Sequence, residues 1–260
     1  MLQFPEDSPD LTRKLKVSVI SLGQPDVVVF GKDMELPAYT LSRAITSLEG
    51  RIIKILNVYE FAFLDSPYVE SQNVVFLIND EGEANELSGN VRSLGINGSL
   101  FTCNDKVSIE GLKVSKFKDE LCEVNLSLSL LSYVVSGTSS PRSKRISQEL
   151  DFSDLSEWLN SKVSEFQPSL DLVLSPVLFP SLGVARRNLG KRVKGFYENN
   201  FSDSNVVYTG VDQLVGKRLA NHVRVSGKRV KEILMDSDPL TAPIYLSIIS
   251  YILKSRISGS

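Results

Sequence analysis

Three carboxylates, an amide and a glycine follow one another in the turn Asn79-Asp80-Glu81-Gly82-Glu83. The apolar run 74–78 before this turn has the length of a buried strand, and apolar residues at helical spacing follow over 86–94. A turn between a strand and the next helix lies at the carboxyl edge of a parallel sheet, where α/β proteins bind ligands. These side chains are therefore candidates for ligand contact, and Glu83 is also a candidate for acid and base chemistry.

A second candidate loop begins with Gly31-Lys32-Asp33, directly after the apolar run 26–30. Gly31 lets the backbone approach a ligand closely, and Lys32 could supply a positive charge to an anion. The alternative is that Lys32 is a solvated surface charge, which is the commoner situation for a lysine.

The second half of the chain offers Glu198 with Asp203, which could form a pair of acids in a cleft. Loops rich in Asn and Asp also arise from turn chemistry alone, which is the commoner explanation. His222, the only histidine in the chain, is a further candidate catalytic group. A lone histidine without a neighbouring cysteine or carboxylate pattern usually has a structural role.

The charge and the motifs exclude several classes of function. A net charge of −2 gives no global attraction to nucleic acid or to anionic membranes, although basic residues cluster over 186–194 and 217–231. We expect these clusters to form a solvated face or a dimer contact rather than a nucleic-acid site, because aromatic residues do not alternate with them. The chain contains no Gly-x-Gly-x-x-Gly and no P-loop, so we expect no cofactor.

The remaining features indicate a cytoplasmic protein. The first ten residues lack the basic start and apolar run of a signal peptide, and no stretch reaches the roughly 18 apolar residues of a membrane span. Cys103 and Cys122 have no metal-ligand spacing, so we expect no metal site. Both cysteines are predicted to be buried thiols of an intracellular protein rather than a disulfide pair.

Hydrophobic periodicity predicts two α/β halves built on one plan. The first half is predicted to hold strands at 26–30, 51–56, 74–78, 100–102 and 113–117, with helices at 10–21, 37–48, 86–94 and 120–135. The second half is predicted to hold strands at 170–175 and 205–209, with helices at 153–166, 182–194 and 238–256, and its segment 210–231 has no clear pattern. The small, polar and basic segment 136–145 is the predicted linker, which gives domains at 1–140 and 141–260.

The stretches IIKILNVYEF and NVVFLINDEGEANELSGNVRSLGINGSLFTCN resemble the sugar isomerase (SIS) domain of glucosamine-6-phosphate synthase and of phosphosugar isomerases. Two tandem halves followed by DPLTAPIYLSIISYIL look most similar to the archaeal-type bifunctional phosphoglucose/phosphomannose isomerases. The resemblance covers nearly the whole chain. It implies two flavodoxin-like halves, each a mainly parallel sheet between helices, and a sugar phosphate or related carbohydrate as the ligand.

The motifs that hold the sugar phosphate in this family are altered here. The family turn reads roughly Ser-x-Ser-Gly-[Glu/Asn/Asp]-[Thr/Ser], whereas Asn79 and Glu81 stand in place of its two serines. A carboxylate in the place of a phosphate-binding hydroxyl repels the ligand. The family's first loop, of the type Gly-x-Gly-[Ser/Thr]-Ser, retains only Gly31.

The resemblance also implies site residues in the second half. Ser175, after the strand at 170–175, and Arg187, in a run that matches Arg-x-Gln-Leu-Asn, correspond to ligand-contacting positions. The family's catalytic glutamate and histidine correspond to Lys191 and Phe201, so a lysine stands at the place of the glutamate and a phenylalanine at that of the histidine.

We therefore expect a SIS-domain homologue that binds a sugar phosphate or related carbohydrate, with weak or no isomerase activity. One alternative is an active glucose-6-phosphate/mannose-6-phosphate isomerase whose catalytic groups have moved, with Glu83, Glu198 and His222 as candidates. Another is a protein- or nucleic-acid-binding scaffold that uses the basic second half. We also expect a homodimer, because the leucine-rich helix 120–135 offers more apolar surface than one small half needs.

Overall fold

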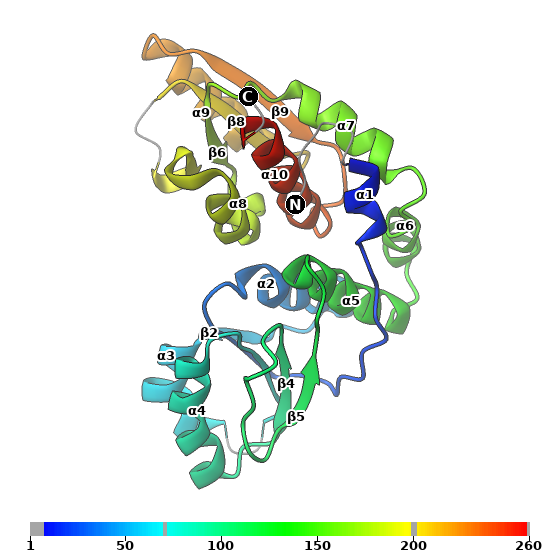
Figure 1. Cartoon of the computed structure of the whole chain (residues 1–260), viewed down its shortest axis with the longest axis vertical. Coiled ribbons are helices and arrows are strands. Elements are labelled where there is room, and N and C mark those ends of the chain that lie inside the picture. Colours follow the sequence, from blue (N-terminus) through cyan, green and yellow to red (C-terminus); the bar gives the residue numbers. More distant parts are fainter. Residues whose placement is uncertain (1–7, 70–71, 199–201, 259–260) are drawn as a thin grey trace. The chain divides into compact units, whose positions relative to one another are not determined.

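The computed structural model describes residues 8–69, 72–198 and 202–258, which form two compact units (Figure 1). The amino-terminal unit comprises Leu15–Lys144. The carboxy-terminal unit comprises Arg145–Ser260 together with the start of the chain up to Lys14, because helix α1 (Ser8–Arg13) packs against α7 (Leu155–Glu165). The boundary between the two units falls within α6 (Pro141–Glu149).

The amino-terminal unit is built on a sheet of five parallel strands in the order β2-β1-β3-β4-β5. Its strands are β1 (Val27–Phe30), β2 (Lys54–Asn57), β3 (Val74–Leu77), β4 (Gly98–Thr102) and β5 (Lys113–Lys116). The central strand β3 is buried along its whole length, as expected for a parallel strand covered on both faces.

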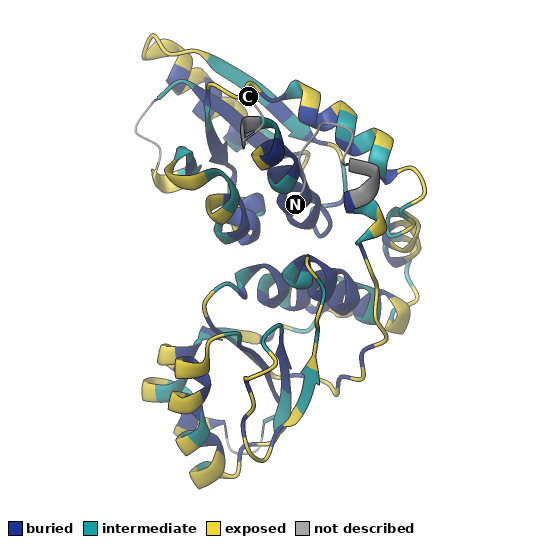
Figure 2. Cartoon of the chain, viewed as in Figure 1, coloured by how far each residue is buried: buried dark blue, intermediate teal, exposed yellow. Residues whose placement is uncertain are grey.

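Helices cover both faces of this sheet (Figure 1). One face is covered by α2 (Glu35–Ala44), which continues as η2 (Ile45–Glu49), and by α5 (Cys122–Gly137), which packs along α2. The other face is covered by α3 (Val58–Glu60), η3 (Phe61–Asp65), η4 (Ser66–Tyr68) and α4 (Glu81–Leu94). Figure 2 shows the central strands and the sheet-facing sides of these helices as buried, the edge strand β5 as intermediate or exposed, and the outer side of α4 as exposed.

The carboxy-terminal unit repeats this plan with four parallel strands in the order β7-β6-β8-β9. Its strands are β6 (Asp171–Leu174), β7 (Val193–Gly195), β8 (Ser204–Thr209) and β9 (Val230–Met235). Helix α9 (Gln213–Val225) covers one face through Leu219, Ala220 and Val223. The remaining elements are α8 (Leu182–Leu189) and α10 (Ala242–Ser258), which pack together, and the short turns η5 (Pro176–Ser181), η6 (Gly190–Arg192) and η7 (Phe196–Glu198).

These observations confirm the predicted fold class, two α/β halves with parallel sheets between helices, but several predicted elements were wrong. The helix predicted over 10–21 ends at Arg13, and the backbone beyond it bonds to α5, with Lys16 N donating to Asn125 Oδ1 at 3.0 Å. The predicted linker 136–145 contains the start of α6. Ser140 caps this helix, since Ser143 N donates to Ser140 Oγ at 3.0 Å and Ser140 N donates to Ser143 Oγ at 2.9 Å.

In the carboxy-terminal unit, the helix predicted over 182–194 stops at Leu189, because Gly190 adopts a φ of 73°. The chain then forms β7, which the sequence did not predict. The unassigned segment 210–231 holds α9 and the start of β9. The small residues Gly216 and Ala220 make the buried face of α9 inconspicuous in the sequence.

Cys103 and Cys122 form a disulfide with a Cα–Cα distance of 5.9 Å, which contradicts the prediction of two unpaired thiols. The prediction rested on composition. The pairing depends instead on the fold, because Cys103 directly follows β4 and Cys122 is the first residue of α5. None of the described helices is both long and apolar enough to cross a membrane.

Candidate functional site

The candidate site of the amino-terminal unit lies where the strand order reverses. The chain leaves β1 towards β2 on one side and leaves β3 towards β4 on the other, so the loops after β1 and β3 diverge. In open parallel sheets, this reversal point is where ligands bind. The loop with Gly31 and Lys32 and the turn from Asn79 to Glu83 follow these two strands, and Glu83 is the residue of the turn that bonds to Lys32 N.

The carboxylate of Glu83 occupies this reversal point. It lies in the first turn of α4, whose N-cap Asp80 accepts a hydrogen bond from Glu83 N at 3.1 Å. Its side chain reaches across to the first loop, where Lys32 N donates to both Glu83 Oε1 and Oε2 at 3.0 Å. Glu83 is only 8% exposed.

The first loop accommodates this carboxylate because it has a glycine. A Cβ atom on Gly31 would lie 2.0 Å from Glu83 Oε2, well inside the van der Waals contact distance. The absence of a side chain at Gly31 therefore makes room for a side chain of the protein itself.

Burial raises the pKa of the Glu83 carboxyl above its ordinary value of 4.5, and the hydrogen bond from Lys32 N–H opposes that rise. The nearby carboxylates of Asp80 and Glu35 raise this pKa further. The Lys32 side chain is exposed, so the backbone N–H of this residue makes the close contact.

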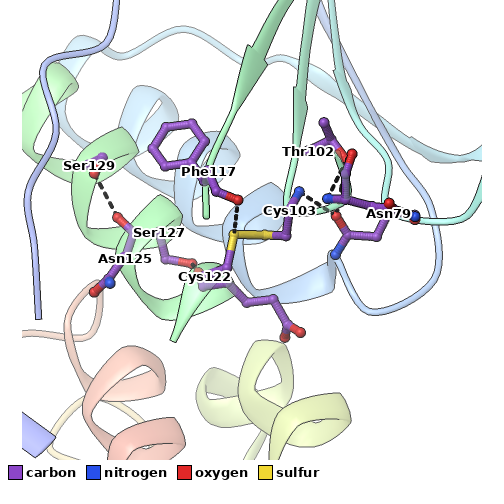
Figure 3. The surroundings of a disulfide bond; sticks show 10 residues. Asn79, Thr102, Cys103, Phe117, Cys122, Asn125, Ser127 and Ser129 are labelled. Carbon is purple, nitrogen blue, oxygen red and sulfur yellow. Dashed lines mark hydrogen bonds between the residues drawn. A yellow bond between two sulfur atoms is a disulfide. The ribbon is translucent and has the colours of Figure 1, made fainter. Parts of the chain in front are cut away.

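Asn79 and Glu81, in the turn after β3, are held away from Lys32. Asn79 is tied to the end of β4, where its Oδ1 accepts from Cys103 N at 2.7 Å (Figure 3). Glu81 is exposed, and its carboxylate lies 3.9 Å from Lys106 Nζ. The carboxylate that meets the first loop is therefore that of Glu83 and not that of Glu81.

The carboxy-terminal unit has the same arrangement between β6 and β8. Asp212, the N-cap residue of α9, accepts from Thr209 N and from Thr209 Oγ1 at 2.8 Å each. Its second oxygen accepts from Val177 N, in the turn after β6, at 3.1 Å. Ser175 lies beside this turn with its hydroxyl buried, and no described residue hydrogen-bonds to that hydroxyl.

Asp212 was not predicted from the sequence, although a usable pattern was present. The segment Thr209-Gly210-Val211-Asp212 follows a buried strand, just as Asn79 and Asp80 follow β3. Each sheet thus carries a carboxylate near the start of the helix after its second central strand. In both cases that carboxylate accepts from a backbone N–H of the loop after the first central strand.

The other predicted residues of the second half do not join this position. Glu198 accepts from Gly195 N at 2.9 Å and is paired with Arg186, so these hydrogen bonds lower the pKa of its carboxyl. Its expected partner Asp203 pairs with Arg229 at 2.9 Å, so the two acids are not a pair. The matched position Phe201 lies outside the described residues.

His222 and Arg187 each lie in the last turn of a helix, α9 and α8 respectively. A helix that follows a parallel strand begins at the carboxyl edge of the sheet and ends near the opposite edge. His222 is exposed near that opposite edge, away from Thr209 and Asp212. It therefore has no place in a catalytic group at the strand ends.

Among the described residues, no group of three or more His, Cys, Asp or Glu side chains is arranged to hold a metal ion. At the strand ends, the carboxylates of Glu83 and Asp212 accept hydrogen bonds from backbone N–H groups of the facing loops. In each unit, a carboxylate of the protein therefore occupies the backbone N–H group at the place where this kind of fold binds ligands.

The fold is similar to that of solved proteins that act on sugar phosphates. A glucosamine-6-phosphate deaminase from Thermotoga maritima is 16% identical, with a TM-score of 0.69 over 97% of this chain and 92% of that chain. A tagatose-6-phosphate ketose/aldose isomerase from Escherichia coli is 10% identical, with a TM-score of 0.60 over 98% of this chain and 89% of that chain.

The carboxy-terminal domain of a glucosamine-fructose-6-phosphate aminotransferase from Francisella tularensis gives a TM-score of 0.60 at 10% identity, over 98% of this chain and 94% of that chain. No protein-family model matches the sequence, and no curated protein matches it. The chain thus shares the two-unit α/β fold of these proteins over nearly its whole length.

Proposed function

We propose that this protein is a non-catalytic homologue of the phosphosugar isomerases that binds a carbohydrate derivative and does not isomerise sugar phosphates. The observation that carries this proposal is the Glu83 carboxylate on Lys32 N, with its counterpart Asp212 on Val177 N. A phosphate at either position would have to displace a carboxylate from its backbone donor or lie against it. Both outcomes cost binding energy, because like charges at close range repel.

The positions of two candidate catalytic residues, Glu198 and His222, support the same proposal. Moving a proton between neighbouring carbons requires a base of tuned pKa within reach of the substrate. Glu198 is an ion-paired carboxylate of lowered pKa, and His222 is exposed near the opposite edge of the sheet. The ligand class is inferred from the three similar structures, whose names all refer to sugar phosphates.

A coupled isomerase assay with fructose 6-phosphate and mannose 6-phosphate tests the catalytic part of the proposal. We expect no turnover above a blank without enzyme. Calorimetry with fructose and fructose 6-phosphate tests the ligand part, and we expect the phosphate to add no affinity. Tighter binding of the phosphate ester by about tenfold or more would contradict the role given to the two carboxylates.

One observation favours the runner-up function, an active phosphosugar isomerase such as the archaeal-type bifunctional enzymes. Glu83 is a nearly buried carboxyl of raised pKa at the strand ends, as general bases often are. If the assay shows turnover, substitution of Glu83 by Gln should abolish it, while substitution of Glu198 by Gln should leave it nearly unchanged.

A further inference from the structure

The last strand of the amino-terminal sheet, β5, has an outer edge that no strand among the described residues pairs with. Its one partner in that part of the chain is β4, in parallel register from Ser99↔Lys113 to Thr102↔Lys116. Phe117 N donates to Thr102 O at 2.9 Å. Because backbone groups alternate in direction along a strand, the N–H and C=O groups of Val114 and Lys116 point away from β4.

A cavity of about 470 Å³ lies on the α5 side of this edge. One wall consists of Lys113 and Ser115, which share a face of β5 by their two-residue spacing, with Phe117 just after the strand and Phe101 of β4. The opposite wall is the segment 18–21, whose backbone is held along α5 by Ser18 N donating to Ser129 Oγ at 2.9 Å. The volume lies within the range of binding pockets.

A covalent link restrains the chain that forms one wall of this cavity. β5 lies inside the loop that the Cys103–Cys122 disulfide closes, and Figure 3 shows this disulfide beside Phe117 at the start of α5. Because the ends of this loop are joined, the strand edge and the Phe117 side of the cavity are held in place in the free protein. A preorganised edge loses less entropy when a partner binds to it.

The charges of the cavity select the kind of partner. Its lining carries Lys113, Lys116, Lys118 and one carboxylate, Asp119, which is itself paired with Lys16 Nζ at 2.8 Å. Lys118 Nζ pairs with Asp105 at 3.0 Å, whereas no ion pair joins Lys113 to another described residue. Lysines on an edge strand repel a second copy of the same edge, but they attract a strand that carries carboxylates.

We propose that the β5 edge is a docking site for an acidic peptide segment of another protein, which adds to the sheet as a sixth strand. The backbone of the peptide would bond to the outward groups of Val114 and Lys116. Every second side chain would enter the cavity, with a carboxylate against Lys113 and a small apolar residue over Ser115 and Phe101.

The test uses the whole protein and three fluorescent seven-residue peptides. The acidic peptide has the sequence Thr-Glu-Thr-Val-Thr-Glu-Thr. In the basic peptide, lysine replaces both glutamates. In the third, prolines replace the two central threonines, so the charge is kept while strand hydrogen bonding is lost. We expect anisotropy to show binding of the acidic peptide, with the basic and proline peptides weaker by about tenfold or more.

Two substitutions and one exchange measurement complete the test. Lys113→Glu should weaken the acidic peptide and strengthen the basic one, whereas the matched change Lys54→Glu, on the opposite edge strand β2, should do neither. Hydrogen exchange should slow at the amides of Val114 and Lys116 when the acidic peptide is added. Equal binding of the acidic and proline peptides would indicate a simple anion site and overturn the proposal. Absence of binding of the acidic peptide at millimolar concentration would also overturn it.

Discussion

The residue that decides the chemistry of the amino-terminal unit is Glu83. It belongs to the turn after β3, and its side chain contacts the loop after β1, at the place where the strand order reverses. It receives hydrogen bonds from Lys32 N, and its own backbone N–H donates to Asp80. The charge in its neighbourhood is mostly negative, since Asp80 and Glu35 are close enough to raise the pKa of its carboxyl. A single substitution there should therefore change both ligand preference and stability.

Glu83→Ala is expected to improve the binding of fructose 6-phosphate by about tenfold or more. The substitution removes a negative charge and leaves Lys32 N–H without its intramolecular acceptor. Glu81→Ser is the matched control, because Glu81 is exposed and its charge is screened by water. Calorimetry on both variants measures the difference. Equal affinities would mean that Glu83 does not exclude the phosphate.

The stability of the protein should also depend on pH through Glu83. Burial raises the pKa of this carboxyl in the folded protein above its ordinary 4.5, so the folded state holds the proton to a higher pH than the unfolded chain. The free energy of unfolding therefore decreases as pH rises from the unfolded pKa through the folded one, and Glu83 contributes no such loss at lower pH.

Glu83→Gln should remove this decrease, because the amide does not ionise. Urea unfolding between pH 4 and pH 7 checks the prediction. The stability of the wild type relative to this variant should decline across that range. Glu81→Gln serves as the control, and the stability of the wild type relative to it should stay nearly constant. A constant difference for Glu83→Gln would show that the carboxyl titrates normally.

Among the elements, the crossover from β4 to α5 carries the largest departure from expectation. The disulfide joins its two ends across a sequence separation of 19 residues. Cross-linking a loop of about this length stabilises a fold by about 3 kcal/mol in the chain-entropy model. We expect the double variant Cys103→Ser, Cys122→Ser to lose stability of that order.

Thermal unfolding with and without dithiothreitol tests this expectation. The reductant should lower the melting temperature of the wild type and leave that of the double variant unchanged. Alkylation under non-reducing conditions provides an independent check, since the wild type should not react without prior reduction. A wild type that reacts fully with the alkylating agent would show that the thiols are free.

The elements that the sequence predicted well are those with a dense apolar pattern, such as the strand at β3 and the helix α10. The elements that it did not predict depend on features other than a dense apolar pattern. α9 buries Gly216, where a Cβ atom would lie 2.4 Å from the Tyr208 ring, so close packing replaces a large apolar side chain. α6 begins at a reciprocal pair of serines that also suits a flexible linker.

The same division applies to the candidate site. The positions of Gly31, Lys32 and Glu83 follow from strand ends, which periodicity identifies. The contact between Glu83 and Lys32 N joins residues 51 apart and depends on strand order, which a single sequence does not specify. Asp212 remained hidden because the helix that it caps was itself unassigned.

At the scale of the whole molecule, both units are parallel sheets with helices, of five and four strands respectively. The sequence suggested that the leucine-rich helix would supply a dimer surface, but the apolar residues of α5 from Val124 to Val135 are buried within the chain. Four exposed apolar residues of the amino-terminal unit lie instead on α3, η3 and η4, beside the edge strand β2. They are Tyr59, Phe63, Leu64 and Tyr68, hereafter the aromatic patch, whereas the exposed Val17, Val19 and Ile52 lie outside these helices.

We expect the protein to form a homodimer through this aromatic patch. Phe63 and Tyr68 are 70% and 80% exposed, and the rings of Tyr59 and Phe63 stack with centroids 6.3 Å apart. Contiguous exposed apolar surface of this kind commonly marks an interaction site. Sedimentation at micromolar concentration should therefore give twice the 28.8 kDa mass of one chain.

The double substitution Phe63→Asp, Leu64→Asp should convert this dimer to a monomer without unfolding it, because both side chains are largely in water in the single chain. Val225→Asp is the control, since Val225 is 81% exposed on α9 of the other unit and should not affect association. Circular dichroism on each variant separates loss of association from loss of fold. A wild type that sediments as one chain would refute the dimer. A dimer that survives the double substitution would show that another surface forms it, and the edge of β2 would be the next surface to test.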